Sequence, residues 1–169
     1  AIRTFGLVTI VIGAGWSVPD DDGRLMLTNT GAAFLGQPGA GLFREGFDMW
    51  LTNSLYDEVT RIGALRGAPI AMALFGTPPP ARRDALMQAL SVIPAGHWLD
   101  VETLFRMVLA SGSDFEVETQ ELSHLWIGGY GNWGNQQLGR TDSEVYWRVV
   151  KCQLMLALLF EPLACFGAV

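Results

Sequence analysis

Residue types that commonly hold metals or act as nucleophiles are sparse in this chain. It contains two histidines, His97 and His124, and two cysteines, Cys152 and Cys165. No second histidine or cysteine stands at ligand spacing from any of them, and there is no Cys-x-x-Cys pair. Both cysteines lie among apolar residues and are expected to be reduced core residues. The sequence therefore predicts no metal site and no disulfide framework.

Sequence patterns of nucleophilic catalysis are also missing. No Gly-x-Ser-x-Gly elbow, papain-type cysteine or serine–lysine pair occurs. His124 has Asp114 and Glu121 near it in sequence as orienting acids, but no activated nucleophile accompanies it, so a structural histidine is the favoured interpretation. We predict no catalytic residue, no cofactor and no small-molecule substrate, and hence a protein that is not an enzyme.

The most unusual stretch runs from Gly128 to Gly139 and holds five glycines together with Tyr130 and Trp133. It lacks the terminal Lys-Ser or Lys-Thr of a phosphate loop and the spacing of a dinucleotide fingerprint. Two interpretations stay open. The loop offers Tyr130 and Trp133 to a ligand or a partner, since exposed aromatic residues are common anchors, or it is an irregular connection whose rings fold back onto the core.

Basic residues supply the candidates for contact with nucleic acid. We predict phosphate contacts from Arg82, Arg83, Arg148 and Lys151; the last two are three residues apart and should share a helix face. The same half of the chain carries six basic and ten acidic residues. A local basic face is compatible with that balance, whereas strong sequence-independent binding to DNA is not.

Composition narrows the class of protein. The 169 residues are 50% hydrophobic and 17% charged, which is enough for a sizeable core in one domain or two small ones. The net charge of −6 opposes bulk attraction to phosphate or anionic lipid. The first residue is Ala1 and no basic segment precedes an apolar one, so we expect a cytoplasmic chain that is a fragment of a longer protein.

The apolar run over residues 152–169 is interrupted by Glu161-Pro162. Because proline breaks an ordinary helix, we expect a buried helix and then a turn here, and no membrane partner.

Hydrophobic spacing and turn residues predict the elements of the first half. We expect a strand within Phe5–Ile12, a turn over Asp20–Gly23 and a second strand over Arg24–Leu27, which together form a hairpin with an acidic tip. Thr28 should cap a short helix through Leu35, with Gly36 as its stop. A long amphipathic helix is expected over Arg44–Arg66.

The second half has the clearer helical pattern. We expect helices over Ala81–Ile93, over Val101–Ala110 with Asp100 as its cap, and from Thr141 to about Phe160. Trp98-Leu99 is expected to be a short strand. The fold class is therefore α-rich α+β, with a hairpin and long helix in residues 1–76 and a helical unit in residues 81–169, or one compact domain containing both.

Parts of this order resemble winged helix-turn-helix domains. The segment from Gly23 to Gly36 is similar to a closing wing strand that leads into a short helix, Trp98–Val108 is similar to a strand and second helix, and Val145–Val169 is similar to a third helix and the start of a wing. The arrangement resembles the tandem winged-helix regions of large bacterial proteins, including those beside helicase modules. The resemblance covers about half the chain and implies a module that binds DNA or docks protein.

Two departures from that pattern affect the expected function. The turn at Asp20–Asp22 would repel phosphate, and the candidate third helix becomes wholly apolar after Lys151. Our first hypothesis is a non-enzymatic, DNA-associated winged-helix module that contacts duplex DNA weakly. The alternative is a protein-interaction or scaffold module, through a protein partner or self-association, because a fold alone does not determine function.

Overall fold

The computed structural model describes residues 2–37, 39–63, 65–67, 77–112, 125–128, 136–137 and 143–169. It divides into two compact units. Unit 1 comprises Ala1–Asp57 with Leu156–Val169, and unit 2 comprises Glu58–Met155. These boundaries differ from the expected division into residues 1–76 and 81–169. The fold class is α-rich α+β, with two small antiparallel sheets among the described residues.

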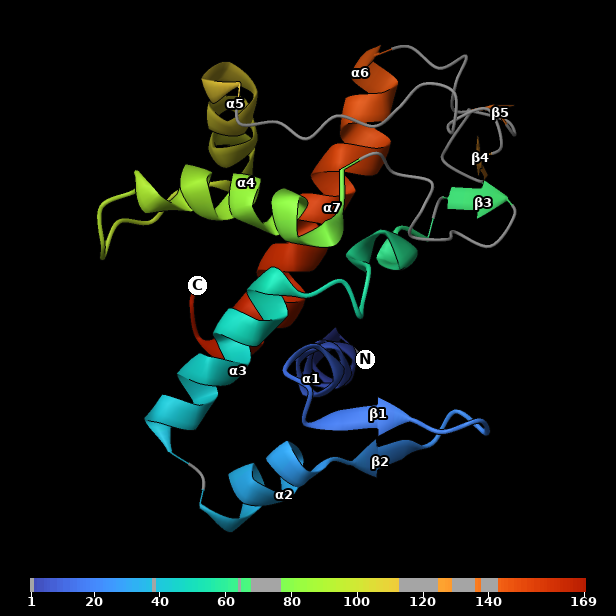
Figure 1. Ribbon diagram of the computed structural model, residues 1–169. Helices are drawn as coiled ribbons and strands as arrows, with labels where there is room; N and C mark the ends of the chain where they lie inside the picture. The colour runs from blue at the N-terminus through green and yellow to red at the C-terminus, as the bar shows by residue number, and fades with distance from the viewer. Residues whose placement is uncertain are drawn as a thin grey trace. The chain divides into compact units, whose positions relative to one another are not determined.

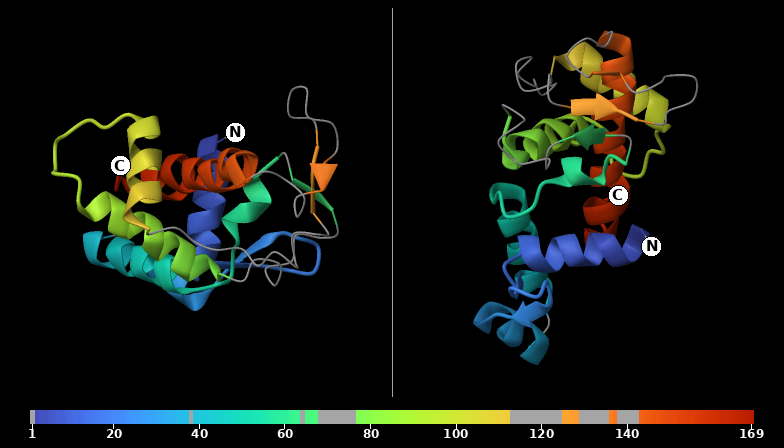
Figure 2. Two further views of the ribbon diagram at one scale, coloured as in Figure 1. Left: turned by 90° about the horizontal axis from the view of Figure 1, so that it is seen from above. Right: turned by 90° about the vertical axis from the view of Figure 1, so that its right-hand side faces the viewer.

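Unit 1 begins with a helix, a hairpin and two more helices (Figure 1). The elements are α1 (Ile2–Gly13), β1 (Ser17–Pro19), β2 (Leu25–Leu27), α2 (Asn29–Gly36) and α3 (Ala40–Thr52). The end of the C-terminal helix completes the unit. Figure 2 shows that α1 crosses this end rather than running along it, and the two helices pack directly against one another.

Residues 5–12 form part of α1, so the expected strand there is wrong. A short apolar run does not distinguish a buried strand from a buried helix, and the β-branched residues of this run favour the strand only weakly. As a helix, the run packs against α3 and against the C-terminal helix. This packing buries Thr9 and Ile10, whereas Leu7 stays exposed.

The predicted hairpin forms, but its first strand lies later than expected. Val18 pairs with Met26 at the centre of the antiparallel register. The Asp20 carboxylate accepts hydrogen bonds from the N–H groups of Asp22 (3.0 Å) and Arg24 (2.7 Å), and Gly23 has the left-handed φ of +76° that closes a three-residue loop. The prediction of the acidic turn and of the second strand is confirmed.

The start of α2 also matches the sequence-based expectation. The Thr28 hydroxyl accepts from the Gly31 N–H at 3.0 Å and donates to the Gly15 carbonyl at 2.7 Å. One side chain therefore caps α2 and ties it to the segment before β1. The helix runs to Gly36, one residue past the predicted end at Leu35.

The expected helix over Arg44–Arg66 is wrong in length. The observed α3 ends at Thr52, where the Asn53 side chain donates to the carbonyl of Met49 at 2.6 Å. The backbone of Asn53 is extended, so the helix ends here. The chain then enters unit 2 through a 3-10 turn, η1 (Glu58–Arg61), and the strand β3 (Leu65–Gly67).

Unit 2 combines helices with a three-stranded antiparallel sheet in the order β3, β4 (Leu125–Ile127), β5 (Gln136–Gln137). Its helices α4 (Pro79–Ser91) and α5 (Val101–Ser111) confirm the sequence-based prediction. Residues 98–99 are not a strand, so that expectation is wrong, and the Trp98 side chain is fully exposed.

The C-terminal helix contains two π-helical turns. Its segments are α6 (Ser143–Tyr146), η5 (Trp147–Lys151), α7 (Cys152–Leu158), η6 (Leu159–Leu163) and α8 (Ala164–Phe166). The expected break at Glu161-Pro162 is wrong, because the π turn η6 carries Pro162 within the helix. A π turn bonds residues five apart, so the proline needs no bond of the ordinary α pattern at this point.

Among the described residues, one helix, Glu144–Phe166, is long and apolar enough to cross a membrane. Within its most apolar window, 61% of the residues are buried inside the protein, as in a core helix.

Trp16 organises the aromatic core of unit 1. Its ring stacks on Phe34 with centroids 3.9 Å apart, and Phe43 lies 6.4 Å away. A Cβ atom on Gly46 would overlap the Trp16 ring, which is rigid and already stacked. A side chain at position 46 therefore has no room.

We expect Gly46→Ala to lower the free energy of unfolding by about 1–3 kcal/mol, the usual cost of overpacking a core. Gly41→Ala, in the same helix, would place its Cβ in open space and should stabilise by up to about 1 kcal/mol. Urea denaturation monitored by tryptophan fluorescence measures both. Equal effects of the two substitutions would contradict this packing.

Asp100 caps α5 and gives a pH-dependent prediction. Hydrogen bonds from the Thr103 hydroxyl and N–H, at 2.6 and 2.9 Å, hold the pKa of the Asp100 carboxyl below its usual value. The carboxylate therefore stabilises the folded state above the unfolded-state pKa of about 3.9, and this contribution is lost as the pH falls through the lowered folded-state pKa. We expect Asp100→Ala to reduce the urea midpoint at about pH 7 and to reduce it less near pH 3.

Asp100→Asn is the matched control, because asparagine caps helices without titrating. The difference in stability between Asp100→Asn and Asp100→Ala should therefore stay constant with pH, whereas the difference of each from the wild type should shrink towards about pH 3. A pH-independent deficit in Asp100→Ala would contradict the linkage.

Candidate functional site

Arg82 and Arg83, two of the residues predicted to contact phosphate, are buried on α4 within unit 2. Arg83 donates to the Glu58 carboxylate from Nε at 3.0 Å and from Nη2 at 2.8 Å, and the two side chains are 0% and 3% exposed. A guanidinium engaged in this way stabilises the unit rather than facing a ligand. The structure therefore places neither arginine where it could reach DNA.

The expectation that Arg148 and Lys151 share one face is wrong. Arg148 is exposed and pairs with Glu144 at 3.1 Å, whereas Lys151 is buried with its Nζ 5.5 Å from the Tyr146 ring centroid and 5.9 Å from that of Trp147. The π turn η5 explains the difference, because it brings residues five apart, such as Tyr146 and Lys151, over one another. The four basic candidates do not form a common surface.

Residues considered for metal binding, catalysis or partner contact fall partly outside the described residues. His124, Tyr130 and Trp133 lie there, as does most of the Gly128–Gly139 loop. His97 is exposed in the turn before α5. Within the ranges that the structure describes, no three His, Cys, Asp or Glu residues gather closely enough to hold a metal ion.

The hairpin of unit 1 exposes apolar side chains on both of its faces. Val18 and Met26, which pair across the strands, are 43% and 52% exposed, and on the opposite face Leu25 and Leu27 are 45% and 54% exposed. Single exposed apolar residues are ordinary, but this short hairpin carries four of them, two on each face. We call Val18, Leu25, Met26 and Leu27 the hairpin patch.

The outer edge of β2 is open as well. In the described part of the chain its sheet has two strands, so β2 pairs only with β1. The Thr28 N–H donates to the Trp16 carbonyl and the Asp20 N–H to the Arg24 carbonyl, so the pairs joined by backbone hydrogen bonds are those of the even-numbered residues. By the alternation of antiparallel ladders, the backbone groups of Leu25 and Leu27 then point away from β1.

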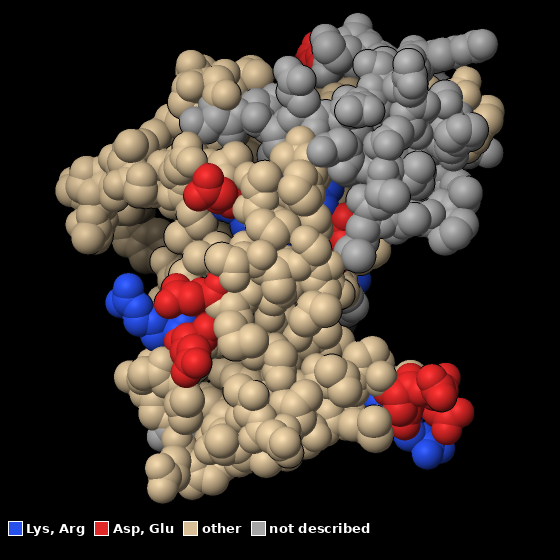
Figure 3. All heavy atoms as spheres, viewed as in Figure 1, with Lys and Arg blue, Asp and Glu red and all other residues tan. Residues whose placement is uncertain are grey.

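Charge differs sharply between the two ends of the hairpin. Figure 3 shows carboxylates gathered at its tip, where Asp20, Asp21 and Asp22 lie with a single neighbouring base, Arg24. The Arg24 and Asp22 side chains approach only to 4.0 Å and are both at least 75% exposed, so this pair is weak. The hairpin patch therefore lies beside a surplus of negative charge.

The acidic turn was predicted from the sequence, and the hairpin patch was not. The signal was the unbroken apolar run Leu25-Met26-Leu27 in a hairpin strand. Successive side chains of a strand point to opposite faces of the hairpin. When a core covers only one face, at least one of three consecutive apolar residues is exposed on the other.

The buried ion pair of unit 2 yields a stability prediction. Arg83→Ala would leave the Glu58 carboxylate buried without this partner, and should lower the free energy of unfolding by about 3–5 kcal/mol. Replacing both residues, Arg83→Met with Glu58→Met, should restore much of the loss, because no charge is then buried there. Urea denaturation measures both variants.

Arg148→Ala provides the control, since its exposed pair with Glu144 should contribute no more than about 0.5 kcal/mol. Similar losses in Arg83→Ala and Arg148→Ala would show that the pair with Glu58 is not buried.

Comparison with known proteins identified no relative of this chain. No family model matches the chain, and no curated protein or solved structure was found to be similar to it. The fold and the hairpin patch are therefore the observations from which a function can be argued.

Proposed function

We propose that the chain is a non-enzymatic protein-interaction module whose contact surface is the hairpin patch. The observation that carries this proposal is the exposure of Val18, Leu25, Met26 and Leu27, each between 43% and 54%, on a hairpin with an open edge. Protein interfaces commonly use apolar patches of this kind surrounded by polar residues.

A winged-helix relationship is part of the proposal. Helix α1 leads directly into the hairpin β1–β2, and a short capped helix follows, as in the wing of such a domain. The helix before the hairpin contains one charged residue, Arg3, in its sequence. A wing with an apolar helix before it and an acidic tip suits protein contact better than contact with phosphate.

The placement of the basic residues gives the DNA-associated hypothesis little support. Arg82, Arg83 and Lys151 are buried, and Arg148 is held by Glu144. Binding driven by phosphate needs several exposed cations that release counterions. We therefore give the protein-interaction function precedence over contact with duplex DNA.

The test combines site-specific photo-crosslinking with a DNA titration. A photo-reactive phenylalanine derivative at position 26 should crosslink a protein in cells, and the same group at Gln88, an exposed residue of α4, should not. Fluorescence anisotropy of labelled duplex DNA at about 50 mM salt should show no binding, because three of the four predicted phosphate contacts are buried and the fourth pairs with Glu144.

Two results would overturn the proposed function. One is equal crosslinking, or none, from positions 26 and 88. The other is micromolar DNA binding that weakens between about 50 and 200 mM salt and is abolished by Arg148→Glu, which would establish a phosphate-contacting face.

A further inference from the structure

We propose that the outer edge of β2 binds an extended segment of another protein, which adds a strand to the hairpin and places Lys or Arg side chains beside Asp21 and Asp22. This inference rests on the protein-interaction function proposed above and specifies the chemistry of the partner.

The backbone of β2 has hydrogen-bonding groups that are not directed towards β1. The N–H and C=O groups of Leu25 and Leu27 point away from β1, and in the described residues no other strand of the chain occupies that side. An open edge of this kind pairs readily with another extended chain. Strand addition is a common mode of peptide recognition, in which main-chain hydrogen bonds supply affinity and alternate side chains supply specificity.

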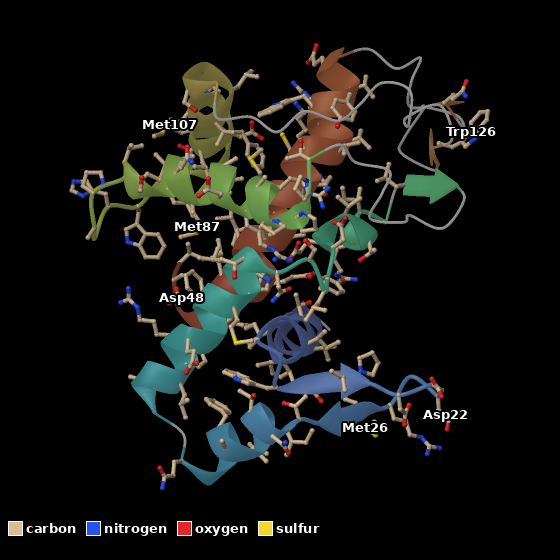
Figure 4. All side chains as sticks on the ribbon, in the orientation of Figure 1. Asp22, Met26, Asp48, Met87, Met107 and Trp126 are labelled. Carbon is tan, nitrogen blue, oxygen red and sulfur yellow. The ribbon has the colours of Figure 1, made fainter. Side chains whose placement is uncertain are left out.

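The side chains of the hairpin are apolar on both of its faces. Figure 4 shows Met26 on β2 and Asp22 at the turn of the same hairpin. Because Val18 and Met26 lie on one face and Leu25 and Leu27 on the other, an added strand would extend an apolar surface on both faces. Its apolar residues therefore do not need to be confined to one side.

Charge at the turn determines which segment fits. The Asp20 carboxylate is engaged by two N–H groups of its own loop, whereas Asp21 and Asp22 are exposed and Arg24 compensates one charge only. A segment with Lys or Arg at the end next to the turn gains attraction, and an acidic segment or a nucleic-acid strand is repelled.

A second copy of the chain fits this edge less well. It would bring no surplus of basic residues, since its own hairpin carries the same acidic turn. Pairing through three-residue strands would also bury far less than the about 1,200 Å² that a stable interface needs. The edge suits a short, weakly bound segment of a different protein.

The experiment selects displayed random peptides on the full chain and then measures synthetic versions of the enriched sequences by fluorescence anisotropy. We expect enriched peptides that place apolar residues along an extended stretch with Lys or Arg towards one end. Their affinity should be micromolar, in keeping with a short strand. Met26→Lys should weaken binding at least tenfold while the far-ultraviolet circular dichroism stays unchanged.

Two further comparisons address charge and backbone separately. Asp21→Asn with Asp22→Asn should weaken binding about fivefold at low salt and less at high salt. Asp84→Asn, an exposed acid of α4 in unit 2, is the control and should have no effect. N-methylation of every second peptide amide should abolish binding in one register and spare it in the other, because only one set of N–H groups faces β2.

The inference is overturned if no peptide is enriched, if the enriched peptides lack basic residues, or if both N-methylated registers bind alike. Self-association in sedimentation that Met26→Lys abolishes would replace the partner segment by a second copy and would also overturn it. Photo-crosslinking from position 26 is independent of these results. If a protein still crosslinks there, the interaction function stands while strand addition fails.

Discussion

The ring of Trp16 is the contact on which the arrangement of unit 1 depends. Trp16 follows α1 and directly precedes β1 in the sequence. Its backbone carbonyl accepts a hydrogen bond from the Thr28 N–H, and its ring stacks on Phe34 of α2. Gly31 and Gly46 leave the space that the tryptophan occupies, since a side chain at either position would overlap it. One residue thereby fixes the hairpin, α2 and α3 relative to one another.

This arrangement explains why the hairpin is exposed. Trp16 and Ser17 are buried at the base, where the Ser17 hydroxyl donates to the Met26 carbonyl at 2.6 Å. From Val18 onwards the strands extend beyond the aromatic core, so the described helices of unit 1 leave the apolar residues there uncovered. An uncovered hairpin of apolar residues costs solubility, and the carboxylates at its tip offset part of that cost.

Much of the local structure could be predicted because the signals lie within a few residues of one another. The caps at Thr28 and Asp100, the turn at Asp20–Gly23 and the pattern of α5 are of this kind. The predictions that failed concern residues whose environment depends on partners distant in the sequence or on irregular backbone. Arg83 looks like a solvated charge until Glu58, 25 residues earlier, is brought to it. The offset between Arg148 and Lys151 arises from a π turn, for which the sequence carries no recognised signal.

The composition of unit 1 has a consequence for how the chain acquires its structure. Helix α1 packs on η6 and α8, yet all of unit 2 lies between them in the sequence. Unit 2 is continuous in sequence, whereas α1 can pack on α3 early but reaches its contacts with η6 and α8 only after Leu156–Val169 has been synthesised. Contacts between segments so far apart in the sequence slow folding, so unit 1 should complete its packing after unit 2 has formed.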